Sequence, residues 1–199
     1  MTIISDDAFV RLFQKRFGLE PVDGWAGPDT IAMLDSLKPP TVDPVDASGI
    51  PDSYWPMLSK IESGDQPYVQ APSSSASGLY QFIRSTWIGE GGKWGPTLRP
   101  AFGGLKPSPE EQLARARTFT AKNAAYLRSR GVPINRATLY AAHFLGPVTA
   151  GSILAAGKGE RADLIAGAAA TAANPSILKG KTVGDFIEWL RVKTGEVAK

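Results

Sequence analysis

A proline-rich stretch at residues 38–49 constrains this chain most, because it divides the sequence into two unequal parts. The stretch, Lys-Pro-Pro-Thr-Val-Asp-Pro-Val-Asp-Ala-Ser-Gly, has three prolines and no apolar periodicity. Such a composition is typical of a semi-rigid linker and not of a helix or strand. We therefore expect a small unit at residues 1–38, a linker at residues 39–49 and a larger domain at residues 50–199.

The composition indicates a folded, mildly basic protein. The 199 residues are 43% hydrophobic and 21% charged, with a net charge of +3. This balance argues against global disorder and lacks the strong basic bias of a nucleic-acid binder. Cysteine is absent and there is one histidine, so we expect no disulfide, no metal site and no cofactor. We expect a monomer.

The N-terminus has no pattern of a targeting signal. The first seven residues, Met-Thr-Ile-Ile-Ser-Asp-Asp, contain neither a basic segment nor an apolar one. No apolar run approaches the roughly 18 residues that a membrane helix needs. We expect synthesis in the cytoplasm without membrane insertion, so a substrate beyond the inner membrane would require separate delivery.

Helical periodicity and capping signals dominate the larger domain and predict a mainly α fold. Ser108-Pro109-Glu110-Glu111 has the pattern of a helix start, and Gly131 ends that helix. Asn135 can cap a helix that ends at Gly146-Pro147. The Gly-, Pro- and Ser-rich segment 66–77 can hold a short β-hairpin. Further helices are predicted at residues 51–62, 79–88, 148–156, 161–172 and 182–194.

Two helices joined by an Asp-Gly turn are predicted for the small unit. The first, at residues 6–17, places four aromatic and aliphatic side chains on one face, and Pro28 opens the second. Gln14, followed by Asp-Gly-x-x-Gly-x-x-Thr at residues 23–30, resembles the helical peptidoglycan-binding domain family. The resemblance implies that Gln14, Asp23 and Trp25 bind the cell wall, with Trp25 stacking on a sugar. The alternative is a helical hairpin that only packs on the larger domain, with Trp25 as a core anchor.

Glu62 is the candidate catalytic residue. It ends the apolar helical segment at residues 50–61 and is followed by Ser63 and Gly64. A lone carboxylate between an apolar helix and a Gly/Ser loop is placed for a raised pKa, which suits a general acid at neutral pH. Desolvation by Tyr54, Trp55 or Phe82 would raise it. The alternative is an ordinary exposed carboxylate at a helix end.

Three segments together resemble the lytic transglycosylases of the goose-type-lysozyme superfamily. Residues 61–64 match the family's Glu-Ser at a helix end, and residues 76–82 match its Gly-Leu-Met-Gln with Tyr80 in place of Met. Residues 142–147 align with its Ala-Tyr-Asn-Ala-Gly-Pro, with His143 and Phe144 in place of Tyr and Asn. The resemblance implies a lysozyme-like helical catalytic domain that acts on bacterial peptidoglycan.

The resemblance also implies a mechanism with one acid. Glu62 protonates the oxygen of the β-1,4 bond between N-acetylmuramic acid and N-acetylglucosamine. As a carboxylate it then takes the proton of the muramic C6 hydroxyl, which attacks C1 and gives a 1,6-anhydro product. Most glycosidases instead use two carboxylates, so hydrolysis with Asp65 or Glu90 as the second acid stays open.

The other residues of the matching segments are candidates for binding the sugar. Gln81 would hydrogen-bond hydroxyl or acetamido groups. Ser63 would donate to the substrate or cap a turn, and Ser77 is predicted to cap the helix that follows it. Gly78 would permit close backbone approach, and Tyr80 would wall the sugar groove or pack in the core.

Tyr140 and His143 are the candidates for holding Glu62. Tyr140 lies one turn before His143 on the same helix face and can steady the carboxyl group. As a neutral imidazole, His143 can orient Glu62 or contact the sugar. As a cation it would lower the pKa of Glu62 and oppose acid catalysis. An ordinary helix histidine is the third possibility.

Size, module order and the missing signal together favour a bacteriophage endolysin acting on Gram-negative cells. Such an enzyme accumulates in the host cytoplasm and reaches the periplasm and wall once the inner membrane is permeabilised. A virion-carried wall-degrading protein has a similar pattern. A protein of another class, a non-catalytic wall-binding or virion structural protein with a degenerate lysozyme fold, also stays open.

Overall fold

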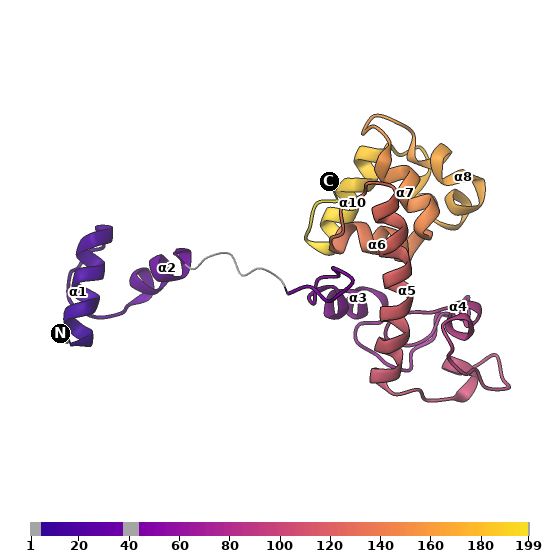
Figure 1. The fold of residues 1–199 in the computed structure, drawn as a ribbon, viewed down its shortest axis with the longest axis horizontal. Helices are drawn as coiled ribbons and strands as arrows, with labels where there is room; N and C mark the ends of the chain where they lie inside the picture. The colour runs from indigo at the N-terminus through magenta and orange to yellow at the C-terminus, as the bar shows by residue number, and fades with distance from the viewer. Residues whose placement is uncertain (1–4, 38–43, 199) are drawn as a thin grey trace. The chain divides into compact units, whose positions relative to one another are not determined.

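The computed structural model describes residues 5–37 and 44–198, and the chain is mainly helical, as predicted (Figure 1). It divides into two compact units, Met1–Val42 and Asp43–Lys199. Residues 38–43, which include the first part of the expected linker, lie outside the described residues. Residues 44–49 are hydrogen-bonded within the larger unit: Arg128 donates to the Ser48 carbonyl, and the Asp46 carboxylate accepts from the backbone of Ser48 and Ile50.

The smaller unit contains helices α1 (Asp6–Phe17) and α2 (Pro28–Ser36). The larger unit contains α3 (Tyr54–Ser63), α4 (Arg84–Gly89), a 3-10 turn η1 (Ala101–Gly104), α5 (Pro109–Ser129), α6 (Arg136–Leu145), α7 (Pro147–Ala155), α8 (Ala162–Ala173), α9 (Pro175–Leu178) and α10 (Val183–Thr194). None of the helices in the described ranges is both long and apolar enough to cross a membrane.

The smaller unit is held together by a glutamine. In residues 5–37 the buried side chains are polar, those of Gln14 and Thr30. The Gln14 amide nitrogen donates to the Asp23 carboxylate at 2.9 Å, the Trp25 carbonyl at 3.0 Å and the Thr30 hydroxyl at 3.3 Å. Its oxygen accepts from the backbone of Asp23 and Gly24. One side chain therefore fixes the Asp-Gly turn between the two helices.

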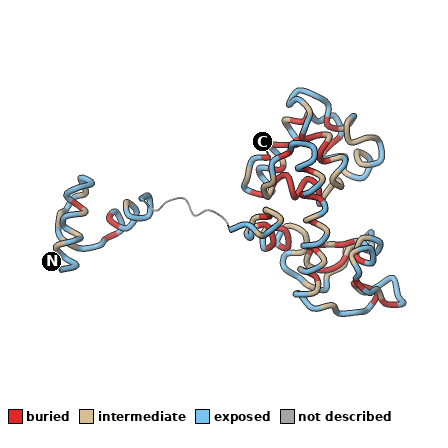
Figure 2. Tube along the Cα trace, in the orientation of Figure 1, coloured by how far each residue is buried: buried red, intermediate tan, exposed pale blue. Residues whose placement is uncertain are grey.

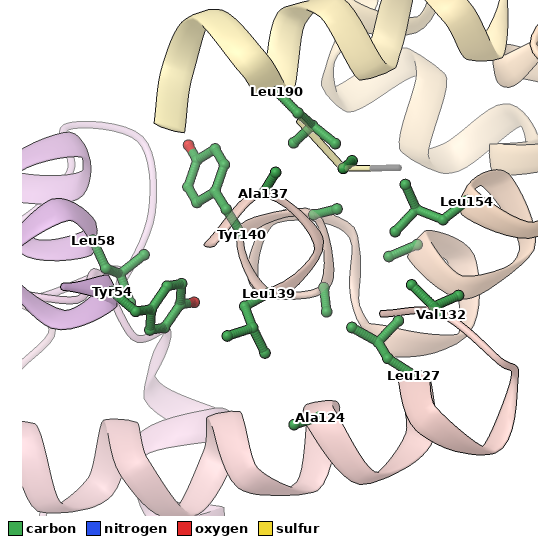
Figure 3. Packing of buried hydrophobic residues seen from close by; sticks show 14 of the residues in the cluster. Tyr54, Leu58, Ala124, Leu127, Val132, Ala137, Leu139, Tyr140, Leu154 and Leu190 are labelled. Atoms are coloured by element: carbon green, nitrogen blue, oxygen red, sulfur yellow. The ribbon is translucent and has the colours of Figure 1, made fainter. Parts of the chain in front are cut away.

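Helix α6 lies at the centre of the larger unit. Six consecutive side chains of this helix are buried, Ala137, Thr138, Leu139, Tyr140, Ala141 and Ala142. A helix buried all round must be surrounded by other elements, and Figure 3 shows side chains of α3, α5, α7 and α10 converging on it. The buried segments of the tube in Figure 2 concentrate in this unit. As predicted, Asn135 caps α6, and the helix ends at Gly146.

The predicted helix at residues 79–88 is wrong at its start, because α4 begins only at Arg84. Residues 78–82 form a turn in which Gln81 has a φ of 47°. Ser77, expected to cap that helix, does not do so. Its buried hydroxyl donates to the Ser75 carbonyl at 2.9 Å and accepts from the Phe102 backbone at 3.2 Å. These bonds tie the turn to a distant loop.

The segment before this turn has the extended pairing that a short hairpin requires. Antiparallel bridges join Gln70 to Ser77 and Ser77 to Phe82, and among the described residues the strand structure is limited to isolated bridges of this kind. Gln112 of α5 fixes the segment by donating to the Pro67 carbonyl at 3.0 Å and accepting from the Leu79 backbone at 2.8 Å. The loop is thus bound to the longest helix.

Candidate active site

A cleft with a volume of about 700 Å³ opens on the larger unit beside α3. It is formed by the end of α3, the loop that leads into α4, one face of α5, the C-terminal part of α6 and the junction of α8 and α9. Its lining contains one carboxyl group, that of Glu62, and no lysine or arginine. The residues lining it are Glu62, Ala71, Ser74, Ala76, Gln81, Phe82, Ile83, Thr86, Phe119, His143, Phe144, Gly146 and Asn174.

Helix α3 places Glu62 in this cleft. Tyr54, Trp55 and Leu58, on the face of α3 that also carries Glu62, are buried, and Gly64, with a φ of 60°, ends the helix just beyond the glutamate. Burial raises the pKa of the Glu62 carboxyl above its ordinary value, the direction that the sequence predicts. The Tyr140 hydroxyl and the positive charge of Lys193 act in the opposite direction and limit the rise.

The Tyr140 hydroxyl is close enough to Glu62 for the two groups to shift each other's pKa. Burial raises the pKa of the Tyr140 hydroxyl, and the neighbouring carboxylate raises it further, so this tyrosine keeps its proton at physiological pH. Its ring is packed against Phe144 and Trp189, with centroid distances of 6.3 and 5.8 Å. This packing limits the rotation of the side chain and keeps its hydroxyl near Glu62.

His143 lies in the same cleft as a neutral side chain. Its ring packs between Phe82 and Phe119, with both centroids at 6.1 Å. Burial lowers the pKa of His143 to about 4, and the nearby backbone of Tyr80 opposes this only in part. Near neutral pH the imidazole therefore carries no charge that would lower the pKa of Glu62. The cationic alternative does not apply there.

Gln81 is the other sequence-predicted residue that lines the cleft. Its backbone is in the left-handed region, and its amide nitrogen donates to the Gly78 carbonyl at 2.9 Å. A non-glycine residue with positive φ is uncommon and is often found where a site is built. This strained turn presents the Gln81 side chain to the cleft.

Four other predicted sugar-binding residues do not line the cleft. The Ser63 hydroxyl donates to the Ser59 carbonyl at 3.0 Å and accepts from the Gln66 backbone, so it caps a turn. Ser77 and Tyr80 are buried. Gly78 does permit close approach, but to protein: a Cβ there would lie 2.3 Å from the Gln112 side-chain oxygen.

Neither candidate for a second carboxylate lines the cleft. Asp65 accepts a hydrogen bond from Ser59 and pairs with Lys60 at 3.5 Å. Glu90 pairs with Lys122 at 2.8 Å. Both carboxylates are engaged elsewhere, so the cleft offers Glu62 without an acidic partner among its lining residues.

Several lining residues were not predicted from the sequence. Phe119 of α5 and Asn174 at the end of α8 are two examples. Phe119 belongs to a long helix with a weak apolar pattern, and Asn174 precedes Pro175 as an ordinary helix boundary would. No local signal marks either residue as part of a site.

In the smaller unit, the three predicted wall-binding residues have different environments. Gln14 is buried and its amide is engaged within the turn, while the Asp23 carboxylate accepts from Gln14 and from the Trp25 backbone. These bonds lower the pKa of Asp23. Trp25 is 67% exposed and does not belong to the interior of the smaller unit.

Comparison with known proteins provides no functional assignment, so the function is inferred from the geometry of the site. No family model matches this chain, and no curated protein matches it in sequence. Among residues 5–37 and 44–198, no three His, Cys, Asp or Glu side chains form a group that could hold a metal ion.

Proposed function

We propose that this protein cleaves the glycan strands of bacterial peptidoglycan as a lytic transglycosylase. The observation that carries the proposal is Glu62, a partly buried carboxyl with a raised pKa in an open cleft whose lining holds no second acid. The resemblance of the three sequence segments supports the same reaction. As a phage endolysin, the enzyme would act from inside the host cell on the wall.

The proposed reaction uses Glu62 twice. The protonated carboxyl donates its proton to the glycosidic oxygen as the bond from that oxygen to C1 breaks. The resulting carboxylate then accepts the proton of the muramic C6 hydroxyl, whose oxygen bonds to C1. Glu62 is protonated again at the end, and no water is consumed. The Tyr140 hydroxyl would stabilise the carboxylate stage by donating a hydrogen bond to it, in line with its lowering effect on the pKa of Glu62.

Product analysis tests this reaction. Purified sacculi digested by the wild-type chain are expected to release muropeptides that end in 1,6-anhydromuramic acid, lighter by one water than hydrolysed products. Mass spectrometry of the soluble fraction measures the ratio. Reducing-end products would establish a hydrolytic muramidase on the same site, and no soluble product at all would favour a non-catalytic wall-binding protein.

We also propose that the smaller unit binds the wall through Trp25. Its exposed ring is suited to stack on a sugar, and the Gln14-centred turn holds the backbone beside it. In co-sedimentation with sacculi, Trp25→Ala is expected to pellet several-fold less than wild type. Leu12→Ala serves as the control, because Leu12 is 58% exposed and lies on the face of α1 opposite Gln14. Equal pelleting of Trp25→Ala and wild type would reject this assignment.

A further inference from the structure

Asn174 occupies a fixed position at the edge of the cleft. It lies between α8 and α9, and it lines the same cleft as Glu62. Helix α8 is broken at Gly167, which has a φ of 83° and a ψ of 167°. The break separates the last turns of α8, which carry Asn174, from the first turns of the helix.

Backbone hydrogen bonds on both sides hold this residue. Its N–H donates to the carbonyls of Ala170 at 3.0 Å and Thr171 at 3.3 Å. Its carbonyl accepts from the backbone of Ile177 at 3.1 Å and Leu178 at 3.0 Å. The residue therefore ends one helix and begins the next, and its backbone has little freedom to move away from the cleft.

In the side-chain amide of Asn174, the nitrogen is hydrogen-bonded and the oxygen has no hydrogen-bond donor among the described residues. The nitrogen donates to the Ala170 carbonyl at 3.1 Å, an assignment that the chemistry requires because a carbonyl can only accept. The side chain makes no capping bond to α9, and no hydrogen bond from the described residues engages its oxygen. Since the two amide atoms point in different directions, the oxygen remains as an acceptor for a ligand.

The cleft needs such an acceptor. Sugar hydroxyls and acetamido N–H groups are donors, and a donor buried without a partner weakens binding. Glu62 must enter the reaction protonated, so it cannot serve as the permanent acceptor. The lining has no other carboxylate, and His143 presents a nitrogen that is shielded from solvent. Besides Asn174, the side-chain acceptors of the lining are the amide oxygen of Gln81 and the hydroxyls of Ser74 and Thr86.

We infer that Asn174 is a substrate-binding residue whose side-chain oxygen accepts a hydrogen bond from an N–H or hydroxyl of a β-1,4-linked N-acetylhexosamine chain. The inference deepens the proposed function, because it assumes that a glycan occupies this cleft. Asn174 lies outside the three segments that carry the family resemblance. Its assignment comes from the position and bonding of its amide.

Binding of tetra-N-acetylchitotetraose, measured by titration calorimetry, tests the inference in the full chain. Glu62→Gln is the parent protein, because it prevents turnover of the probe. Adding Asn174→Leu or Asn174→Ala is expected to weaken binding about threefold to tenfold, the range for loss of one hydrogen bond. Ser176→Ala, an exposed position on α9 outside the cleft, is expected to leave the affinity unchanged.

Melting temperatures of the same variants separate direct contact from damage to the cleft. Weaker binding by both Asn174 variants at an unchanged melting temperature supports the assignment. Affinities equal to the parent, weakening that appears only with a lowered melting temperature, or no probe binding by the parent would each overturn it. If the wild-type chain released no muropeptides while Asn174 still governed probe binding, cleavage would be rejected and the binding residue retained.

Discussion

Glu62→Gln is expected to reduce muropeptide release from sacculi by roughly a thousandfold, within the range that general acid catalysis contributes. The amide has nearly the shape of the carboxyl group but cannot protonate the glycosidic oxygen or accept the C6 proton. Because the cleft lining holds no other carboxylate, no neighbouring group can replace it. Initial rates of soluble product formation, compared with wild type at the same protein concentration, measure the effect.

Asp65→Asn provides the matched control. It removes the nearest candidate for a second carboxylate by the same chemical change, and it is expected to retain most of the activity because Asp65 is bonded to Ser59 and Lys60 outside the cleft. Loss of activity in Asp65→Asn comparable to that in Glu62→Gln would instead support a two-carboxylate hydrolase. Undiminished activity in Glu62→Gln would show that Glu62 is not the catalytic residue.

Thermal stability shows whether Glu62→Gln remains folded. The pKa of Glu62 is raised in the folded state, so folding favours its protonated form. Ionisation of Glu62 therefore begins to destabilise the folded state once the pH exceeds the pKa of the unfolded chain, near 4. The full loss of folding free energy is present once the pH exceeds the raised pKa of the folded state. Glu62→Gln removes this cost. It is expected to melt no lower than wild type at neutral pH, with any gain fading as the pH falls through that window.

Trp87→Ala is expected to lower the free energy of unfolding of the larger unit by about 3–5 kcal/mol. Trp87 has 0% of its surface exposed, donates to the Lys93 carbonyl at 2.8 Å and packs against Phe102 with centroids 4.8 Å apart. The variant leaves a cavity and an unpaired carbonyl. Urea unfolding followed by circular dichroism measures the change.

Ile88→Ala is the control for Trp87→Ala, since it truncates the next side chain of α4 at a position that is 47% exposed. It is expected to change stability by less than about 1 kcal/mol, because little apolar area is lost from a packed environment. Similar losses in both variants would mean that α4 contributes to stability as a helix and that Trp87 is not a packing centre.

Helix boundaries set by local chemistry were predictable from the sequence. The Ser108-Pro109 start of α5 and the Asn135 cap of α6 lie where the residue types place them, because each cap is a contact across three residues. The start of α4 was not predictable. The turn before it is fixed by two long-range hydrogen bonds. Phe102 donates to Ser77 across 25 residues of sequence, and Leu79 donates to Gln112 across 33.

The sequence likewise indicated some residues of the candidate site and not others. Glu62, Gln81 and His143 come from separate segments and line one cleft. The charge of His143 was left open by the sequence, because it depends on burial between two rings, one of them on α5. Asn174 was missed because its contribution depends on how the junction of α8 and α9 is packed beside the cleft, which no nearby residue pattern encodes.

The polar interior of the smaller unit has a thermodynamic consequence. Heat capacity increases on unfolding mainly because apolar surface becomes hydrated, and the described residues 5–37 have no fully buried apolar side chain to expose. The unit should therefore unfold with a small heat-capacity change and a shallow dependence of stability on temperature. Its resistance to cold should exceed that of the larger unit, whose apolar core loses its driving force as water is cooled.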